Sequence, residues 1–206
     1  MADIKYISDF LTRVEGPRQT SGYVPCFKKA GGTANYRGSG NPANYEAMGA
    51  SGVTIGTGCD LGQTDLKTLR EYGVSDESLL SALSPYIGLK KAAALKKLYE
   101  RPLNITSAQA EALDNAVHGG YLNKYVRPAY DRDSKAAFDS LPKQAQAVVM
   151  SVCFQKGAGG VKRDWPKTWK YLTTQDWKNA AHELKFGFVK YVGRRTIEGK
   201  LLEELL

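Results

Sequence analysis

Cysteine and histidine are scarce in this chain of 206 residues, which has three cysteines and two histidines. The cysteines are Cys26, Cys59 and Cys153, so no two of them form a Cys-x-x-Cys pair. Since only His118 and His182 could complete a ligand set, the sequence argues against a structural zinc site. We expect the cysteines to be reduced and buried.

Long apolar runs are also missing. No stretch approaches the roughly 20 apolar residues that a membrane-spanning helix needs. The first residues, Met-Ala-Asp-Ile-Lys-Tyr, lack the basic segment and the apolar run of roughly 7 to 15 residues that mark a secretory signal. We therefore expect a protein that is made in the cytoplasm without a signal peptide.

Two common catalytic loops are absent. No Gly-Lys-Ser/Thr loop for phosphate occurs, and no serine lies in a Gly-x-Ser-x-Gly elbow. Gly56-x-Gly58 resembles a dinucleotide loop, but the third glycine, Gly62, comes one residue late. Asp60 would also place negative charge where a pyrophosphate lies, which argues against nucleotide binding.

What the chain does have is size and positive charge. Its length suits one globular domain, residues 1–206, that can bury a real core. Its net charge is +8, and the basic residues are spread along the chain rather than gathered in a tail. This balance favours an anionic partner.

The pattern of apolar residues predicts an α+β fold. Asp3 is a plausible N-cap for a helix with Ile7 and Leu11 on its apolar face, which stops at Glu15-Gly16-Pro17. Glycines and asparagines in residues 18–62 indicate a small β lobe. Helical periods follow from Thr64 onward, with a capping box at Thr106-Ser107-Ala108-Gln109. We expect a helical lobe of residues 1–17 and 63–206.

Glu15 is the first candidate for chemistry. A glutamate in the last turn of a helix meets the negative end of the helix dipole, which is unfavourable. Glu15 could be a solvated residue at a helix end. Alternatively, the helix delivers this carboxyl group into a cleft, where burial and the dipole keep it protonated near neutral pH and able to donate to a leaving oxygen.

The second candidate is the glycine-rich stretch Ser51–Gly62. If it stayed extended, Thr54 and Asp60 would lie about 20 Å apart, at roughly 3.3 Å per residue. Gly56 and Gly58 can adopt positive φ and fold the chain back, so the hydroxyl and the carboxylate could approach a common centre. The alternative is a plain hairpin in which Asp60 caps the next turn.

The aromatic residues support a different class of function. Trp165, Trp169 and Trp177 alternate with lysine and arginine, which suits stacking on a nucleic acid, and a basic nucleic-acid-binding protein is the alternative reading. However, Trp165 and Trp169 are four residues apart, as in a helix that packs on its neighbour. Core anchoring is the better interpretation of this pair, and no nucleic acid is expected as a partner.

Taken together, these features resemble the phage lysozyme superfamily of the T-even type, and within it the pesticin-like muramidases most closely. The resemblance rests on Glu15-Gly16 at the end of the first helix and on Thr54-Ile55-Gly56-x-Gly58 followed by Asp60. The stretch from Val149 to Gly157 resembles the family's buried helix, which ends in Phe-Asn/Gln-x-Gly, and Gly193-Arg194-Arg195 resembles its arginine-rich turn.

The resemblance implies a lysozyme-like fold with the active-site cleft between the lobes, and no cofactor or metal. It implies hydrolysis of the β-1,4 bond between N-acetylmuramic acid and N-acetylglucosamine in peptidoglycan. Glu15 would be the general acid, Asp60 would hold the attacking water or stabilise the transition state, and Thr54 would orient the water. Analogy with the family favours inversion, for which the carboxyl groups lie roughly 6.5 to 9.5 Å apart.

Some alternatives remain open within this reading. Glu46, from the long segment before the hairpin, could join the site, and Thr57 could compete for the water. The protein could be a phage endolysin released through a holin pore to act in the periplasm or on the cell wall. It could equally be an effector or a bacteriocin catalytic domain, or a peptidoglycan-binding module without catalysis. We expect a monomer that the anionic bacterial envelope attracts.

Overall fold

The chain folds into two units in the computed structural model, which describes residues 2–206. The sheet unit is Glu15–Val117, and the helical unit combines the chain up to Val14 with His118–Leu206. This division differs from the predicted lobes, because residues 63–117 belong with the sheet and not with the later helices. The prediction that the whole chain is one catalytic domain stays a prediction.

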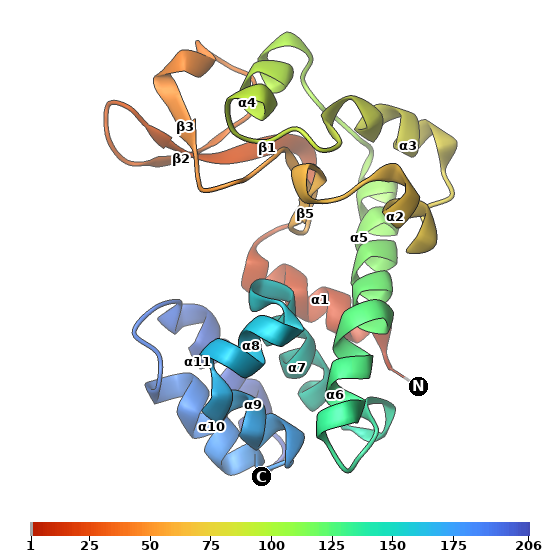
Figure 1. Cartoon of the computed structure of the whole chain (residues 1–206), viewed down its shortest axis with the longest axis vertical. Helices are drawn as coiled ribbons and strands as arrows, with labels where there is room; N and C mark the ends of the chain where they lie inside the picture. The colour runs from red at the N-terminus through yellow and green to blue at the C-terminus, as the bar shows by residue number, and fades with distance from the viewer. Residues whose placement is uncertain (1) are drawn as a thin grey trace. The chain divides into compact units, whose positions relative to one another are not determined.

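The sheet unit contains a short antiparallel sheet followed by helices. Its strands are β1 (Gln19–Lys28), β2 (Thr33–Tyr36), β3 (Tyr45–Ala47), β4 (Thr54–Gly56) and β5 (Cys59–Asp60). The strand order is β2-β1-β4-β5, and β3 pairs with β1. The helices are α2 (Leu66–Glu71), α3 (Glu77–Leu83), α4 (Lys91–Glu100) and the greater part of α5 (Ser107–Tyr121). Helix α4 packs on β1 and β3 (Figure 1).

The helical unit is built around α7 (Lys143–Lys156). Nine consecutive residues of this helix, from Ala145 to Cys153, are buried. Around it are α1 (Ile4–Glu15), α6 (Arg127–Asp133), α8 (Ala158–Asp164), α9 (Pro166–Thr173), α10 (Trp177–Phe186) and α11 (Val192–Glu203). Helices α10 and α11 lie side by side, and α11 also packs on α7 (Figure 1). The α+β class, with a first helix, a small sheet and later helices, is thus confirmed.

Local sequence signals correctly predicted where two of the helices begin. The Asp3 carboxylate accepts a hydrogen bond from the N–H of Tyr6 at 3.0 Å, which confirms it as the cap of α1. The capping box before α5 is reciprocal: the Thr106 hydroxyl accepts from the N–H of Gln109 at 3.1 Å, and the Gln109 amide oxygen accepts from the N–H of Thr106 at 3.0 Å.

Other features follow from packing and are weak in the sequence. Helix α8 contains Gly159 and Gly160, which disfavour a helix, yet it forms with Val161 fully buried. All three cysteines are free and buried, as predicted. None of the helices in residues 2–206 is both long and apolar enough to cross a membrane.

Candidate active site

The hairpin β4–β5 brings Thr54 and Asp60 together. In the register of the sheet, Thr54 lies opposite Asp60 on one side and opposite Tyr23 of β1 on the other. Directly opposed residues of antiparallel strands point to the same face, with Cβ atoms about 4.5 to 5.5 Å apart. Tyr23, Thr54 and Asp60 therefore form one row across three strands, which confirms that the glycine segment folds back.

Two glycines make this reversal possible. Gly56 has φ +61° and Gly58 has φ +83°, which is the conformation expected for them. A side chain at Gly56 would also collide with a neighbour, because its Cβ would overlap a carboxylate oxygen of Asp114. Gly56 is thus required by both the backbone angle and the available space.

Asp114 of α5 anchors the hairpin, and the sequence analysis missed it. Its carboxylate accepts hydrogen bonds from the N–H and the hydroxyl of Thr57, both at 2.7 Å, and from Nε of Arg18 at 2.7 Å. The Asp114 side chain is only 1% exposed. The available signal was an acidic residue beside Leu113 and Val117, on the apolar stripe of a predicted helix.

Thr57 and Glu46 lie outside the site row, which is the row formed by Tyr23, Thr54 and Asp60. The Thr57 hydroxyl is buried and donates to Asp114, so it anchors the turn and does not face a substrate. Glu46 lies opposite Phe27, four residues along β1 from Tyr23, or about 13 Å at 3.3 Å per residue. It lines a separate pocket of about 430 Å³ beside Tyr45.

Asp60 is held firmly by backbone groups. Its Oδ1 accepts hydrogen bonds from the N–H of Gly62 at 2.8 Å and of Gly52 at 3.1 Å. The contact with Gly62 caps a 3₁₀ turn, Leu61–Gln63, so the capping role and the proximity to Thr54 coexist. Burial raises the pKa of Asp60, while the two N–H groups and the charge of Lys90 oppose this rise.

Glu15 is the last residue of α1 and belongs to the sheet unit with Thr54 and Asp60. The expected burial of this carboxyl group is wrong, because Glu15 is exposed. Helix α1 ends at this residue, and the chain continues through Gly16, whose φ is +108°. Burial raises the pKa of Tyr23, and the negative charges of Glu15 and Asp60 raise it further.

A serine and a histidine also lie within hydrogen-bond distance of each other in the helical unit, but a substrate has no access to them. Ser8 Oγ and His118 Nδ1 are 2.5 Å apart in the helical unit. The two side chains are 1% and 0% exposed, so a substrate cannot reach the hydroxyl. His118 packs edge-on against Phe154. The pair is part of the core, which agrees with the absence of a nucleophile elbow.

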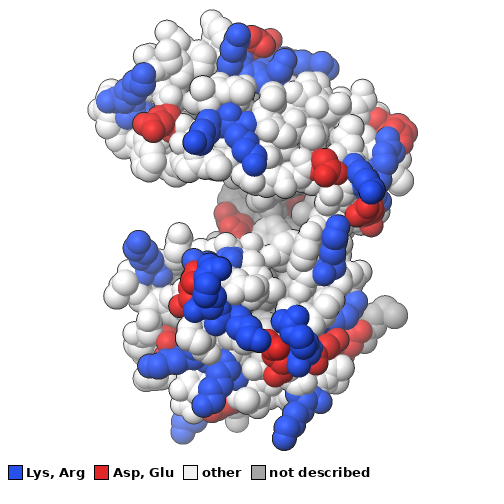
Figure 2. Space-filling view, viewed as in Figure 1, with Lys and Arg blue, Asp and Glu red and all other residues white. Residues whose placement is uncertain are grey.

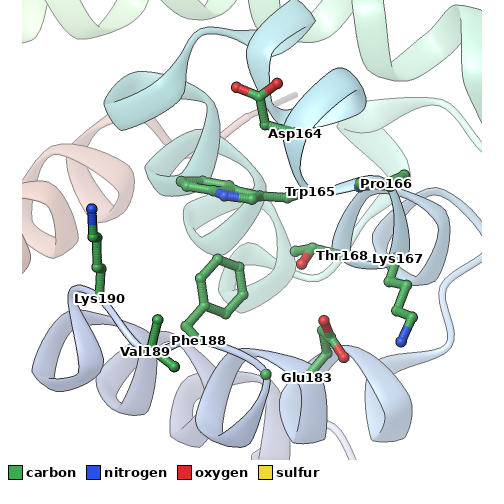
Figure 3. A pocket seen from close by; sticks show the side chains of 10 residues that line it. Asp164, Trp165, Pro166, Lys167, Thr168, Glu183, Phe188, Val189 and Lys190 are labelled. Carbon is green, nitrogen blue, oxygen red and sulfur yellow. The ribbon is translucent and has the colours of Figure 1, made fainter.

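The helical unit has a second pair of carboxylates, around a pocket of about 420 Å³. Figure 3 shows Asp164 and Glu183 at opposite ends of this pocket, with Trp165 between them. A hydrogen bond from Arg163 at 2.6 Å holds the pKa of Asp164 well below its usual range. Asp164 therefore stays ionised, and its carboxylate is engaged by Arg163 and by Lys156 at 2.8 Å.

The tryptophan segment gives no support to stacking on a nucleic acid. Trp169 is only 4% exposed, and its indole N–H donates to Asp133 at 2.9 Å. Its ring packs edge-on against Tyr130, so the predicted role as a core anchor is confirmed. Figure 2 shows lysine and arginine scattered over the visible face of each unit, with acidic side chains among them.

The fold is α+β, and the sheet unit holds two candidate carboxyl groups, Asp60 opposite Thr54 in the hairpin and Glu15 at the end of the first helix. Paired carboxyl groups are what glycoside hydrolases use. Residues 5–178 match the family described as "Pesticin: Bacterial toxin homologue of phage lysozyme, C-term". The match covers most of the chain, so the chain belongs to this family and is a lysozyme-type domain of the peptidoglycan-degrading kind. No curated protein matches the chain. Among residues 2–206, no cluster of three or more metal-ligating side chains occurs.

Proposed function

We propose that this protein is a muramidase that hydrolyses the β-1,4 bond between N-acetylmuramic acid and N-acetylglucosamine. The observation that supports this most is the row in which Thr54 lies opposite Asp60, in the same unit of the structure as Glu15. Glycosidases need two carboxyl groups in different environments, one to give a proton and one to act while charged.

The two carboxyl groups lie in different environments, because Asp60 is half-buried among backbone N–H groups and Glu15 is exposed. Asp60 accepts hydrogen bonds from two N–H groups, which stabilise its ionised form and fix its direction. It would hold the attacking water, and the neighbouring Thr54 hydroxyl would orient that water. Glu15 would protonate the oxygen of the leaving sugar.

Replacing Glu15 by Gln tests the proposal, and Glu46→Gln, at an exposed glutamate of the same unit, is the matched control. We expect the first variant to lose about 10²- to 10⁴-fold in the rate of turbidity clearing, because general acid catalysis contributes about this much. Binding to sacculi and the thermal unfolding midpoint should be unchanged in both variants. Glu46→Gln should clear turbidity like the unmodified protein.

The digestion products identify the bond that is cut. Sacculi are digested, the products are reduced with borohydride, and the new ends are identified by mass spectrometry. A muramidase yields reduced N-acetylmuramic acid. Reduced N-acetylglucosamine, an anhydro sugar or a released peptide would instead indicate a glucosaminidase, a transglycosylase or an amidase, and each of these would refute the proposal. The anomer formed first, followed by NMR, distinguishes inversion from retention.

For the biological role, we propose a phage endolysin that leaves the cytoplasm through a holin pore and acts on the host cell wall. An antibacterial effector or bacteriocin domain is the second candidate, since the family description itself names a bacterial toxin. Lysis of the producing cell only when a holin is co-expressed is the result expected for an endolysin. The net charge of +8 favours attraction to the anionic envelope in either role.

A further inference from the structure

Tyr23 is the member of the site row to which neither the sequence analysis nor the proposed mechanism gives a role. It lies on β1 directly opposite Thr54, and Thr54 lies opposite Asp60. The side chain is half-buried. A phenol at this place can offer a hydrogen-bond donor to the face of the sheet that carries the aspartate.

Arg37 holds the ring of Tyr23 in place. The carbon atom at the centre of its guanidinium group lies 5.3 Å from the ring centroid, which is a cation–π distance. Arg37 is itself fixed, since Nη1 donates to the carbonyl of Ser21 at 2.8 Å and Nη2 donates to Oε1 of Gln19 at 2.6 Å. A planar guanidinium with two such partners has little freedom to move.

The same set of contacts extends to the segment that follows Glu15 in the sequence. The amide nitrogen of Gln19 donates to the carbonyl of Pro17 at 2.6 Å, two residues after Glu15. Hydrogen bonds and one ring contact thus connect Pro17, Gln19, Arg37 and Tyr23 in sequence. This series joins the segment that follows the predicted general acid to the row that contains Asp60.

An irregularity in the pairing of β1 with β4 places Tyr23 opposite Thr54. Gln19 lies opposite Gly56 and Tyr23 lies opposite Thr54, so β1 uses more residues than β4 over the same span. The extra residues are pinned from outside the sheet: the N–H of Gly22 donates to Leu103 at 2.9 Å, and the Ser21 hydroxyl donates to the side chain of Asn104 at 2.7 Å. Bulges of this kind redirect side chains and are frequent beside active sites.

The electrostatic surroundings keep the hydroxyl group protonated. Burial raises the pKa of Tyr23, and the negative charges of Glu15 and Asp60 raise it further, while the charge of Arg37 opposes them. The phenol is therefore a neutral donor that feels both carboxyl groups.

We propose that Tyr23, held by Arg37, is a positioning residue whose hydroxyl group donates toward the Asp60 carboxylate, in addition to the backbone N–H groups of Gly52 and Gly62 that already hold it. This inference rests on the proposed muramidase function. A donor at this place stabilises the charged form of Asp60, which is the form that holds the attacking water.

The test is Tyr23→Phe, which removes the hydroxyl group and keeps the ring on which Arg37 stacks. The matched control is Tyr99→Phe at an exposed tyrosine of α4. We expect kcat of Tyr23→Phe to fall about tenfold or more, since misplaced catalytic groups cost rate, with little change in KM or in thermal stability. The acid limb of the pH–rate profile should move to higher pH, because Asp60 loses a donor that favours its ionised form.

A titration that needs no activity tests the proximity of the three groups. The ring carbon that bears the hydroxyl of Tyr23 is followed by ¹³C NMR through alkaline pH in the unmodified protein, in Glu15→Gln and in Asp60→Asn. Each substitution removes a negative charge, so the pKa of Tyr23 should fall in both variants. A pKa that neither variant changes would overturn the inference.

The outcomes separate this inference from the function beneath it. If the unmodified protein cuts glycan strands and Tyr23→Phe has the same kcat and pH profile, Tyr23 has no positioning role and the muramidase proposal stands. If the unmodified protein releases no muropeptides, both proposals fail. A loss of rate with an unchanged pH profile would indicate only a structural effect and would also overturn the inference.

Discussion

The two units of the molecule each bury carboxylates, and they use them differently. In the helical unit, Glu198 of α11 is 0% exposed and binds Arg194, Arg195 and Ser151, which connects α11 to α7. In the sheet unit, Asp114 binds two groups: Thr57, which lies in the turn between two very short strands, and the nearby Arg18. One carboxylate joins helices that an apolar core already holds, and the other holds a hairpin.

The difference lies in what else holds each structure. Helix α7 is buried along most of its length, and the core around it draws residues from every helix of the unit. Strands β4 and β5 have three and two residues, so their ladder alone gives little stability. We infer that losing Glu198 affects the folding of its unit, whereas losing Asp114 affects the placement of Thr54 and Asp60.

The largest effect on stability should come from Glu198→Gln. This change leaves Arg195, which is fully buried, without its negative partner, and breaking such a buried pair costs about 3 to 5 kcal/mol. Urea unfolding measures the cost. Protein that remains folded should keep its lytic rate per molecule, because the network lies outside the sheet unit.

Glu203→Gln on the same helix is the matched control. Glu203 pairs with Lys185 at 2.6 Å, but its side chain is 42% exposed, and exposed pairs contribute about 0 to 1 kcal/mol. Equal losses in Glu198→Gln and Glu203→Gln would contradict the importance of burial in this unit.

A smaller loss of stability, with a larger loss of activity, should follow Asp114→Asn. The neutral amide can still accept from the N–H of Thr57, but its NH₂ group would face the Thr57 hydroxyl and Arg18. We expect about 1 to 3 kcal/mol of destabilisation, the cost of buried polar groups that lose their partners. Clearing of sacculi should fall together with the order of the hairpin, which amide hydrogen exchange measures at Thr57.

Glu111→Gln, at an exposed position of the same helix, is the control for this change. Hairpin exchange and activity should both match the unmodified protein in that variant. An Asp114→Asn protein with full activity would show that the turn does not depend on its anchor, and the contrast between the two units would lose its basis.

The sequence predicted what depends on local chemistry. Gly56 and Gly58 indicated a reversal because only glycine adopts positive φ without strain, and the reversal brought Thr54 to Asp60 as expected. Asp3 capped the first helix for an equally local reason. Such features need no knowledge of distant residues.

The rest depends on contacts between distant parts of the chain. Asp114 meets Thr57 across 57 positions, and no pattern within either segment specifies that partner. The row position of Tyr23 depends on an irregular register in β1. The sequence could not decide between an exposed and a buried Glu15, because a dipole argument predicts an effect at a helix end and does not say which residues cover it. The catalytic roles of Glu15, Thr54 and Asp60 stay predictions.

The smallest effect should come from Asp60→Asn, and it should have the opposite sign. The amide oxygen can keep both bonds that Oδ1 accepts, at 2.8 and 3.1 Å. Burial raises the folded-state pKa of Asp60 above its ordinary 3.8, so the folded protein holds this proton more tightly than the unfolded chain does. The free energy of unfolding therefore falls as pH rises through that interval, and the penalty is complete above the folded pKa. The amide side chain of the variant cannot ionise, so the variant does not have this penalty.

We expect the Asp60→Asn variant to be inactive yet slightly more stable than the unmodified protein at neutral pH, with the difference shrinking toward pH 3 in urea unfolding. A difference in the free energy of unfolding that does not vary with pH would mean that ionisation of Asp60 does not destabilise the folded protein. The carboxylate of the site would then not differ in this respect from the ion pairs of the helical unit.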